Sequence, residues 1–179
     1  ITVRATDTAG QATDALVDFV VNAPPVADAG GSPTINEGSL VSLDGSGSSD
    51  TESAPFSYRW SLGDGSFADG AFATHRYEQD GTYPVMLTVT DTAGSQASGS
   101  AVVHVNNVSP VVLPISDQAA ELGQQFTLTA TFTDAGVRDT HTALVDWGDG
   151  TTTSATVVEA EGAGTISATH VYGRTGSFQ

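Results

Sequence analysis

The chain has 179 residues, of which 21 are acidic and five are basic, all of them arginine, so its formal net charge is −16 at pH 7. This charge excludes a nucleic-acid-binding protein, because phosphate contact needs clustered Lys or Arg, and the lack of cysteine excludes disulfide frameworks and thiol chemistry. A hydrophobic content of 39% excludes wholesale disorder, and no apolar run is long enough to cross a membrane.

The first predicted element is a pair of strands within residues 1–22. Its landmark, Asp-Thr-Ala-Gly at 7–10, returns 84 residues later at 91–94, and Asn22 and Asn106 keep the same spacing. A fixed spacing between landmarks is typical of repeated modules. The later copy closes a module, so residues 1–22 are predicted to be the C-terminal strands of a preceding module.

Residues 23–107 are predicted to form one complete module. Tyr58, Trp60 and Leu62 alternate with polar residues, and so do the apolar residues between 83 and 89. This period of two is typical of strands with one buried face. Segments rich in Gly, Asp and Ser separate the strands, and no window shows a sustained helical stripe. Because Trp60 shares a strand face with Tyr58 and Leu62, we expect it in the core rather than on a sugar-binding surface.

Residues 108–179 repeat the same landmarks in the same order. Gly-Asp-Gly at 63–65 returns at 148–150, and the His-x-aromatic motif at 75–77 returns at 170–172. Apolar side chains alternate with threonine along one stretch of this segment: Phe126, Leu128, Ala130 and Phe132. The repeat stops soon after its Gly-Ser-Phe landmark. The segment is therefore predicted to be a second module that lacks its last strands.

The two ends of the chain match each other as consecutive parts of one strand. Residues 176–179 followed by residues 1–7 have the length and the apolar alternation of residues 81–91. Two arrangements stay open. The parent polypeptide continues as a covalent array of modules, which is the simpler expectation, or a free subunit donates residues 1–22 to its neighbour's open sandwich edge by β-strand addition. Both make neighbouring copies of the same module the expected partner.

Four motifs in order give the middle of the chain a family signature: LDGSGSSD at 43–50, YRWSLGDG at 58–65, HRY at 75–77 and GTYPVMLTVTD at 81–91. Together they resemble the polycystic-kidney-disease (PKD) domain, although Ser61 stands where that family often has an acidic residue. The second copy resembles a divergent relative found in large bacterial and archaeal surface proteins. The resemblance implies an all-β fold of tandem Ig-like (PKD-type) β-sandwiches with Greek-key antiparallel sheets.

The same resemblance implies a protein with no catalytic activity of its own, located outside the cell or at the cell surface. We expect a structural repeat module of an extracellular fibre, stalk or adhesin shaft, joined end to end with neighbouring modules. The alternative is an ancillary polysaccharide- or protein-binding module of a secreted hydrolase, which predicts exposed aromatic side chains on one sheet. We do not expect the chain to bind nucleic acid, nor any part of it to insert into a membrane.

The polar motifs favour structural roles over catalysis. The two Gly-Asp-Gly segments suit tight turns, because Gly supplies positive φ and Asp bonds its own backbone. His75 and His170 recur two residues before an aromatic without a second His or Cys at zinc-ligand spacing, so structural hydrogen bonds are expected. His104 and His141 carry no motif. With no G-x-S-x-G elbow and no phosphate-binding loop, we expect no enzyme and no catalytic residue.

Calcium is the one cofactor that the sequence favours, because it takes oxygen ligands from loop carboxylates. The candidate ligands lie in the loops of both modules: Asp50, Glu52 and Asp64 in the first, and Asp134, Asp139 and Asp146 in the second. The competing interpretation is that these residues are solvated surface acids and turn caps of a strongly acidic protein.

Overall fold

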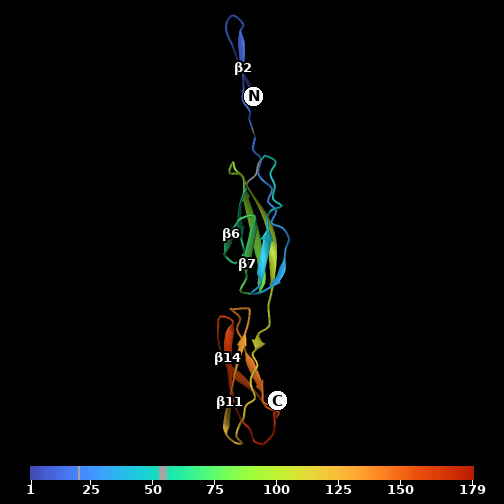
Figure 1. The fold of residues 1–179 in the computed structure, drawn as a ribbon, viewed down its shortest axis with the longest axis vertical. Helices are drawn as coiled ribbons and strands as arrows, with labels where there is room; N and C mark the ends of the chain where they lie inside the picture. Colours follow the sequence, from blue (N-terminus) through green and yellow to red (C-terminus); the bar gives the residue numbers. More distant parts are fainter. Residues whose placement is uncertain (20, 53–55) are drawn as a thin grey trace.

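A computed structural model describes residues 1–19, 21–52 and 56–179. The regular structure in this part of the chain is entirely β-strand, which confirms the predicted all-β class, and it contains no helix that could cross a membrane. Figure 1 shows three parts that follow one another along the long axis: an N-terminal hairpin, a β-sandwich and a second β-structure. We call residues 23–107 the first module and residues 108–179 the second module.

The described residues of the N-terminal hairpin and the first module form nine strands. The hairpin consists of β1 (Thr2–Thr6) and β2 (Ala12–Leu16). The strands of the first module are β3 (Thr34–Asn36), β4 (Leu40–Asp44), β5 (Ser57–Ser61), β6 (Phe67–Asp69), β7 (Phe72–Arg76), β8 (Gly81–Thr90) and β9 (Gln96–Asn106). They form one sheet in the order β3-β9-β8-β5-β6 and a second sheet of β4 and β7. Neighbouring strands are antiparallel except β3, which runs parallel to β9.

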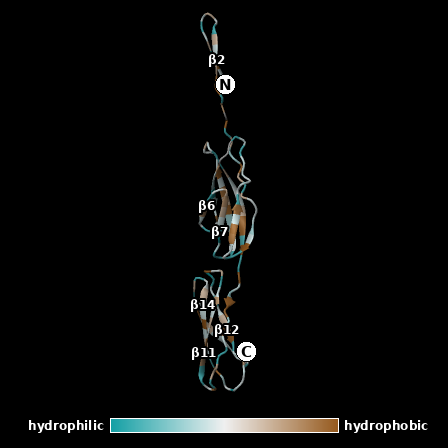
Figure 2. Cartoon of the chain, in the orientation of Figure 1, coloured by the Kyte–Doolittle hydropathy of each residue, from teal (hydrophilic) through white to brown (hydrophobic). Residues whose placement is uncertain are grey.

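The core of the first module lies between its two sheets. On β8, Val85, Leu87 and Val89 are buried, as the alternation predicted. Trp60 on β5 is fully buried and its indole Nε1 donates a hydrogen bond to the carbonyl oxygen of Gly70 at 3.0 Å. This confirms Trp60 as a core residue, with its one polar atom satisfied. Figure 2 shows apolar residues gathered along the strands of this module.

The second module is one sheet with a less complete core. Its strands are β10 (Val111–Val112), β11 (Gln125–Thr133), β12 (Ala143–Asp146), β13 (Thr152–Ala160) and β14 (Ala163–Val171), in the order β10-β11-β14-β13-β12. β12 and β13 alternate between exposed and half-buried side chains, whereas β11 buries Ala130 and Phe132 and β14 buries Ala168. Among the described residues, the large buried cluster belongs to the first module alone.

The two modules touch end to end at a small junction. The side chain of Gln79 donates a hydrogen bond to Asp139 across it. Gly38, at φ +70°, lies so close to the second module that a Cβ at this position would be 3.3 Å from the Cβ of Ala135. Figure 1 shows the modules stacked along the long axis at this point. The junction therefore has direct side-chain and backbone contacts in addition to the linking chain.

Candidate functional site

Each module holds an aspartate turn that is bound to a histidine. In the first, Asp64 Oδ1 accepts hydrogen bonds from the backbone N–H of Ser66 at 2.9 Å and from its hydroxyl at 2.5 Å. Asp64 Oδ2 lies 2.7 Å from His75 Nε2. Burial by itself would raise the pKa of Asp64, but the hydrogen bonds from Ser66 and His75 outweigh it and hold that pKa below its usual value. The predicted structural role of His75 is confirmed.

The Asp64, Ser66 and His75 side chains have the residue types of a hydrolytic triad but not its geometry. A triad places the carboxylate and the hydroxyl on opposite nitrogens of the imidazole. Here Asp64 and Ser66 both lie next to His75 Nε2, at 2.7 and 3.4 Å. Moreover, the Ser66 hydroxyl donates directly to Asp64. The histidine therefore cannot take the hydroxyl proton while the aspartate supports its far side, and the group is a turn clasp.

The second module repeats this clasp. Asp149 Oδ1 accepts from the backbone N–H of Thr151 at 3.0 Å and from its hydroxyl at 2.6 Å, and Asp149 Oδ2 lies 2.8 Å from His170 Nε2. The hydrogen bond from the Thr151 side chain lowers the pKa of Asp149, and that from His170 adds to the effect. The same three-residue arrangement occurs at the equivalent turn of each module. This repetition favours a structural role over a unique reaction centre.

A buried tyrosine joins the clasp of the first module to the core. Tyr77 donates a hydrogen bond from its hydroxyl to the carbonyl oxygen of Leu62 at 2.7 Å, and its ring meets His75 edge-on at 4.6 Å between centroids. Burial, with a further contribution from the Asp64 charge, raises the pKa of Tyr77 to about 12. Tyr77 therefore stays protonated in ordinary conditions and acts as a hydrogen-bond donor.

The acidic residues predicted in the first module are not gathered around one point. Asp50 Oδ1 accepts from the backbone N–H of Glu52 at 3.3 Å, and Asp50 Oδ2 is buried without a hydrogen-bond partner in the described part of the chain. Glu52 accepts from the backbone N–H of Ala23 at 3.3 Å. Asp64 belongs to the clasp described above. No group of three acidic or histidine ligands within 4.8 Å of one another includes these residues among those described.

Two of the acidic residues predicted in the second module do meet, together with one from the first module. Carboxylate oxygens of Glu37, Asp134 and Asp139 lie within 4.8 Å of one another at the junction. Glu37 is 2% exposed, and its two oxygens accept from the backbone N–H groups of Val108 at 2.7 Å and Asp80 at 3.0 Å. The remaining predicted acid, Asp146, caps a turn by accepting from the N–H of Gly148 at 3.0 Å. Glu37 was missed from the sequence because no motif marks it.

His141, which carries no sequence motif, lies between two carboxylates. Its Nε2 is 2.7 Å from Asp134 Oδ2, and its Nδ1 is 2.5 Å from Glu159 Oε2. The hydrogen bond with Asp134, and then that with Glu159, raises the pKa of His141 above its usual value. Burial would raise the pKa of Asp134, but its hydrogen bonds from His141 and from the backbone of Gly136 lower it. The arrangement is an ion triad that stabilises a protonated histidine.

The exposed aromatic side chains of the first module lie on two different sheets. Phe67 on β6 and Phe72 on β7 are both exposed, but β6 belongs to the five-stranded sheet and β7 to the sheet with β4. Phe67 lies opposite Ser61, and Ser61 lies opposite the exposed Met86 on β8. The guanidinium of Arg59 lies 4.8 Å from the centre of the Phe67 ring. The outer face of this sheet thus carries a mixed aromatic, thioether and cationic patch.

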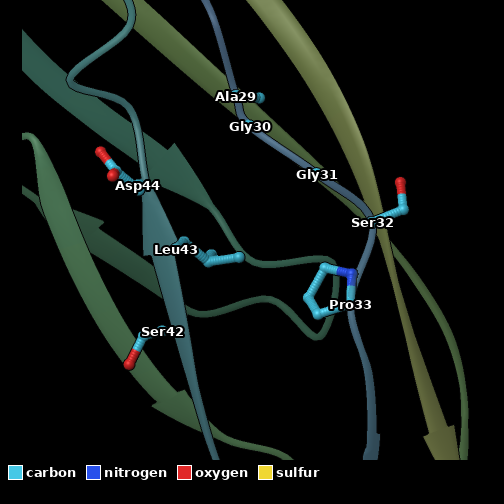
Figure 3. A pocket seen from close by; sticks show the side chains of 8 residues that line it. All are labelled: Ala29, Gly30, Gly31, Ser32, Pro33, Ser42, Leu43 and Asp44. Atoms are coloured by element: carbon cyan, nitrogen blue, oxygen red, sulfur yellow. The ribbon is translucent and has the colours of Figure 1, made fainter.

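A shallow hollow of about 310 Å³ lies between strand β4 and residues 29–33. In Figure 3, Leu43 points toward the segment that ends at Pro33, whereas Ser42 and Asp44 point away from it. The hydrogen bonds that Asp44 accepts from Ser46 hold the pKa of Asp44 below its usual value. The residues that line the hollow include neither a histidine nor any other basic side chain. The hollow therefore offers an ionised carboxylate at its rim and no acid–base pair.

A larger groove of about 460 Å³ runs over the apolar face of the second module. Most of the side chains that line it are aliphatic or aromatic, among them Val112, Leu128, Phe132, Val145, Val157 and Ile166. An apolar groove of this size exposes surface that a finished sandwich covers.

Comparison with known proteins places the middle of the chain within a recognised domain type. A sequence model described as "PKD domain" matches residues 22–106. The solved PKD1 domain of the metalloprotease PrtV from Vibrio cholerae is 31% identical, with 47% of this chain and 99% of that chain covered and a TM-score of 0.40.

Two proteases are similar over about half of the chain. Collagenase ColA of Clostridium perfringens (strain 13 / Type A) is 34% identical over 102 residues, which is 57% of this chain and 9% of the collagenase. Pre-pro-metalloprotease PrtV of Vibrio cholerae serotype O1 (strain M66-2) is 35% identical over 92 residues, which is 51% of this chain and 10% of that protein. The chain thus spans about a tenth of the length of these curated relatives.

Proposed function

The chain belongs to the PKD domain family through residues 22–106, and from that premise we propose that it is a non-catalytic ancillary segment of a secreted hydrolase. The observation that carries this proposal is the recurrence of the same module, at 34 and 35% identity, in a collagenase and in a metalloprotease. Neither relative is a fibre protein by name. The hydrolase interpretation therefore takes precedence over the fibre, stalk or adhesin shaft expected from the sequence.

The absence of catalysis is supported by the geometry of the clasps. Each pairs an aspartate with a histidine whose ring nitrogen is already engaged. Each is repeated at the equivalent turn of the other module, and the clasp histidine of the first module packs against Tyr77. An acid or base needs a proton-transfer partner within hydrogen-bond reach and room for a substrate. In the clasps these side chains are engaged with one another and hold turns.

The patch on the outer face of the five-stranded sheet is the proposed contact with substrate. Phe67 is 59% exposed and Met86 is 47% exposed, and both lie opposite Ser61 on neighbouring strands. Arg59 adds a cation beside the Phe67 ring. Aromatic residues, Met and Arg are the residues enriched in protein–protein interfaces, whereas sugar binding favours several aromatic rings on one face. We therefore propose an insoluble protein, such as the collagen named for one relative, as the surface that the segment contacts.

Cosedimentation tests this attachment. The chain is mixed with fibrous collagen and, separately, with insoluble cellulose, and the fraction bound is measured in the pellet. We expect retention on collagen, loss of that retention in the F67S/M86S double variant, and no retention on cellulose. The control is F72S, which removes a phenylalanine that is even more exposed, at 67%, from the other sheet. Retention on cellulose, or equal loss in F72S, would contradict the proposal.

Calcium is proposed to bind at the junction between the modules. Glu37, Asp134 and Asp139 supply carboxylate oxygens there, and Gln79 Oε1, whose own amide group bonds Asp139, is a buried oxygen without a hydrogen-bond partner in the described part of the chain. Oxygen donors of this kind suit calcium. The ion would neutralise converging negative charge and hold the two modules in line.

A further inference from the structure

The small sheet of the first module has a free edge along β4. β4 pairs with β7 on one side and ends the order of its sheet, so no strand lies along its other side in the part of the chain that the structure describes. The edge belongs to the module that has two facing sheets around a buried core. Edge strands carry backbone groups that can pair with another chain. The free edge is therefore a property of a finished sandwich.

The path of residues 26–33 explains why this edge is open. Val26 and Ser49 exchange both of their backbone hydrogen bonds, at 2.7 and 2.9 Å, so the segment starts antiparallel to the residues that follow β4. It then crosses to the other sheet, where the carbonyl oxygen of Pro33 accepts from the N–H of His104 on β9 at 2.9 Å. The crossing takes the segment away from β4 before it can pair with that strand.

The backbone groups that face the open edge belong to every second residue of β4. Gly45, directly after the strand, donates its N–H to the carbonyl oxygen of Ala71 at 2.8 Å, on the β7 side. In an antiparallel pair, alternate residues bond the partner and those between them point away from it. Ser42 and Asp44 therefore direct their backbone groups away from β7. The carbonyl oxygen of Asp44 agrees with this, because a Cβ added at Gly30 would lie 2.8 Å from it.

The hollow of about 310 Å³ lies beside this edge and has an apolar floor. Ala29, Leu43 and Pro33 contribute to its lining, and Figure 3 shows Leu43 pointing toward the segment that ends at Pro33. A Cβ added at Gly31, on the far wall, would meet nothing within 4 Å, so the wall leaves space there. Successive side chains of a strand point to opposite faces. A strand added to β4 would thus place every second side chain over this floor.

The charges at one end of the edge favour a basic partner. Asp44 and Asp28 are both exposed and both flank Gly30, the first through its carbonyl oxygen and the second by accepting the N–H of Gly30 at 2.9 Å. Arg76 lies at the other end of the strand pair. Opposite charges on neighbouring strands attract and like charges repel, and the net charge of −16 adds the same preference. A Lys or Arg beside Asp44 is therefore favoured.

We propose that the free edge of β4 binds an extended, basic peptide segment of another protein by β-strand addition. The segment runs antiparallel to β4, which brings its N-terminal end to Asp44. Its backbone bonds Ser42, its inward side chains are small and aliphatic and enter the hollow, and a Lys or Arg near its N-terminal end meets Asp44. This site lies on the sheet opposite the patch of Phe67 and Met86, so it is independent of attachment to collagen.

Titration of the whole chain with a short peptide tests the charge preference. The probe is an acetylated peptide of alternating valine and threonine with lysine as its second residue, and amide shifts in NMR spectra give the dissociation constant. We expect saturable binding that shifts residues 29–33 and 40–44. Exchange of the lysine for glutamate should weaken binding about tenfold. The D44K variant should reverse this preference, whereas D69K, with the same change of net charge on the other sheet, should keep it.

Methylation of the peptide nitrogens tests strand addition itself. Only every second residue of an added strand donates its N–H to β4. Methylation of that set should abolish binding, and methylation of the other set should leave it unchanged. The S42P variant should also abolish binding, since the N–H that it removes faces away from β7. Equal effects of the two methylated sets, no binding of the lysine peptide at millimolar concentration, or an unreversed preference in D44K would each overturn the proposal.

Discussion

At the scale of single residues, the aspartate turns explain why Gly-Asp-Gly and His recur together. The carboxylate of Asp64 holds its own turn through Ser66 and holds the next strand through His75. Such contacts between a turn and a distant strand fix the position of the turn, since both carboxylate oxygens are engaged. Asp149 and His170 do the same in the second module.

Replacing Asp64 by Asn should destabilise the first module by about 1–2 kcal/mol, because the amide cannot keep all the hydrogen bonds that the carboxylate accepts. The control is D69N. The Asp69 side chain is 76% exposed and forms only a 3.4 Å surface ion pair with Arg59. Its replacement by Asn should therefore lower the free energy of unfolding by less than about 0.5 kcal/mol. Urea unfolding of both variants measures the difference. Equal effects would show that the clasp contributes nothing beyond surface charge.

The His141 triad makes the stability of the second module depend on pH. The raised pKa of His141 means that its contribution is fully present below the usual value of 6.5 and is lost as pH rises through the folded-state value. The lowered pKa values of Asp134 and Glu159 mean that their contributions are present above 3.8 and 4.5 and are lost as pH falls. The second module should therefore be most stable in mildly acidic solution.

Thermal unfolding between about pH 5.5 and about pH 8.5 checks this expectation. The transition of the second module should move to lower temperature as pH rises, and the H141Q variant should lose that dependence. The H104Q variant is the control, since His104 is exposed on β9 in the first module. If H104Q removed the dependence and H141Q kept it, the triad would not be its source.

At the scale of elements, the completeness of the sandwich sets the cost of removing an apolar side chain. Leu87→Ala should cost about 3 kcal/mol, because Leu87 is fully buried between two sheets and its removal leaves a cavity. Leu128→Ala should cost about 1 kcal/mol, since Leu128 is half-buried beside the open groove. Calorimetry, with one transition for each module, measures both. Equal losses of stability in the two variants would contradict this account, because they would mean that Leu128 is as well covered as Leu87.

The strands and their buried faces were predictable because alternation needs only local sequence. Tyr58, Trp60 and Leu62 had the period of a strand, and the structure places Trp60 and Leu62 in the core. The parallel pairing of β3 with β9 was not predicted, because it joins segments about seventy residues apart and no local pattern encodes it. The clasps were partly predictable, since Gly-Asp-Gly and His-x-aromatic each recur.

The ion groups were harder to predict because their members come from distant segments. His141 meets Glu159 only through the pairing of neighbouring strands, and nothing near His141 in the sequence signals that contact. Glu37 meets Asp139 only because the two modules stack. The predicted ligands Asp134 and Asp139 did gather, whereas Asp146 became a turn cap. Sequence motifs thus locate turns, and tertiary contacts decide which acids converge.

At the scale of the whole molecule, the junction decides how stiffly the two modules are joined. Calcium at Glu37, Asp134 and Asp139 should raise the unfolding temperature by a few degrees at millimolar concentration, since binding stabilises the folded state by about 1 kcal/mol at several times the dissociation constant. The E37Q variant should abolish the rise. E78Q, a nearby exposed glutamate, should leave it intact. An unchanged unfolding temperature in the parent chain would exclude the ion.

The central claim is that the exposed patch of Phe67, Met86 and Arg59 attaches the chain to an insoluble protein. The most direct test is the dissociation constant for fibrous collagen, measured for the parent chain, for the F67S/M86S variant and for the F72S control. The account predicts weaker binding by F67S/M86S and unchanged binding by F72S. Equal dissociation constants for all three chains would contradict it.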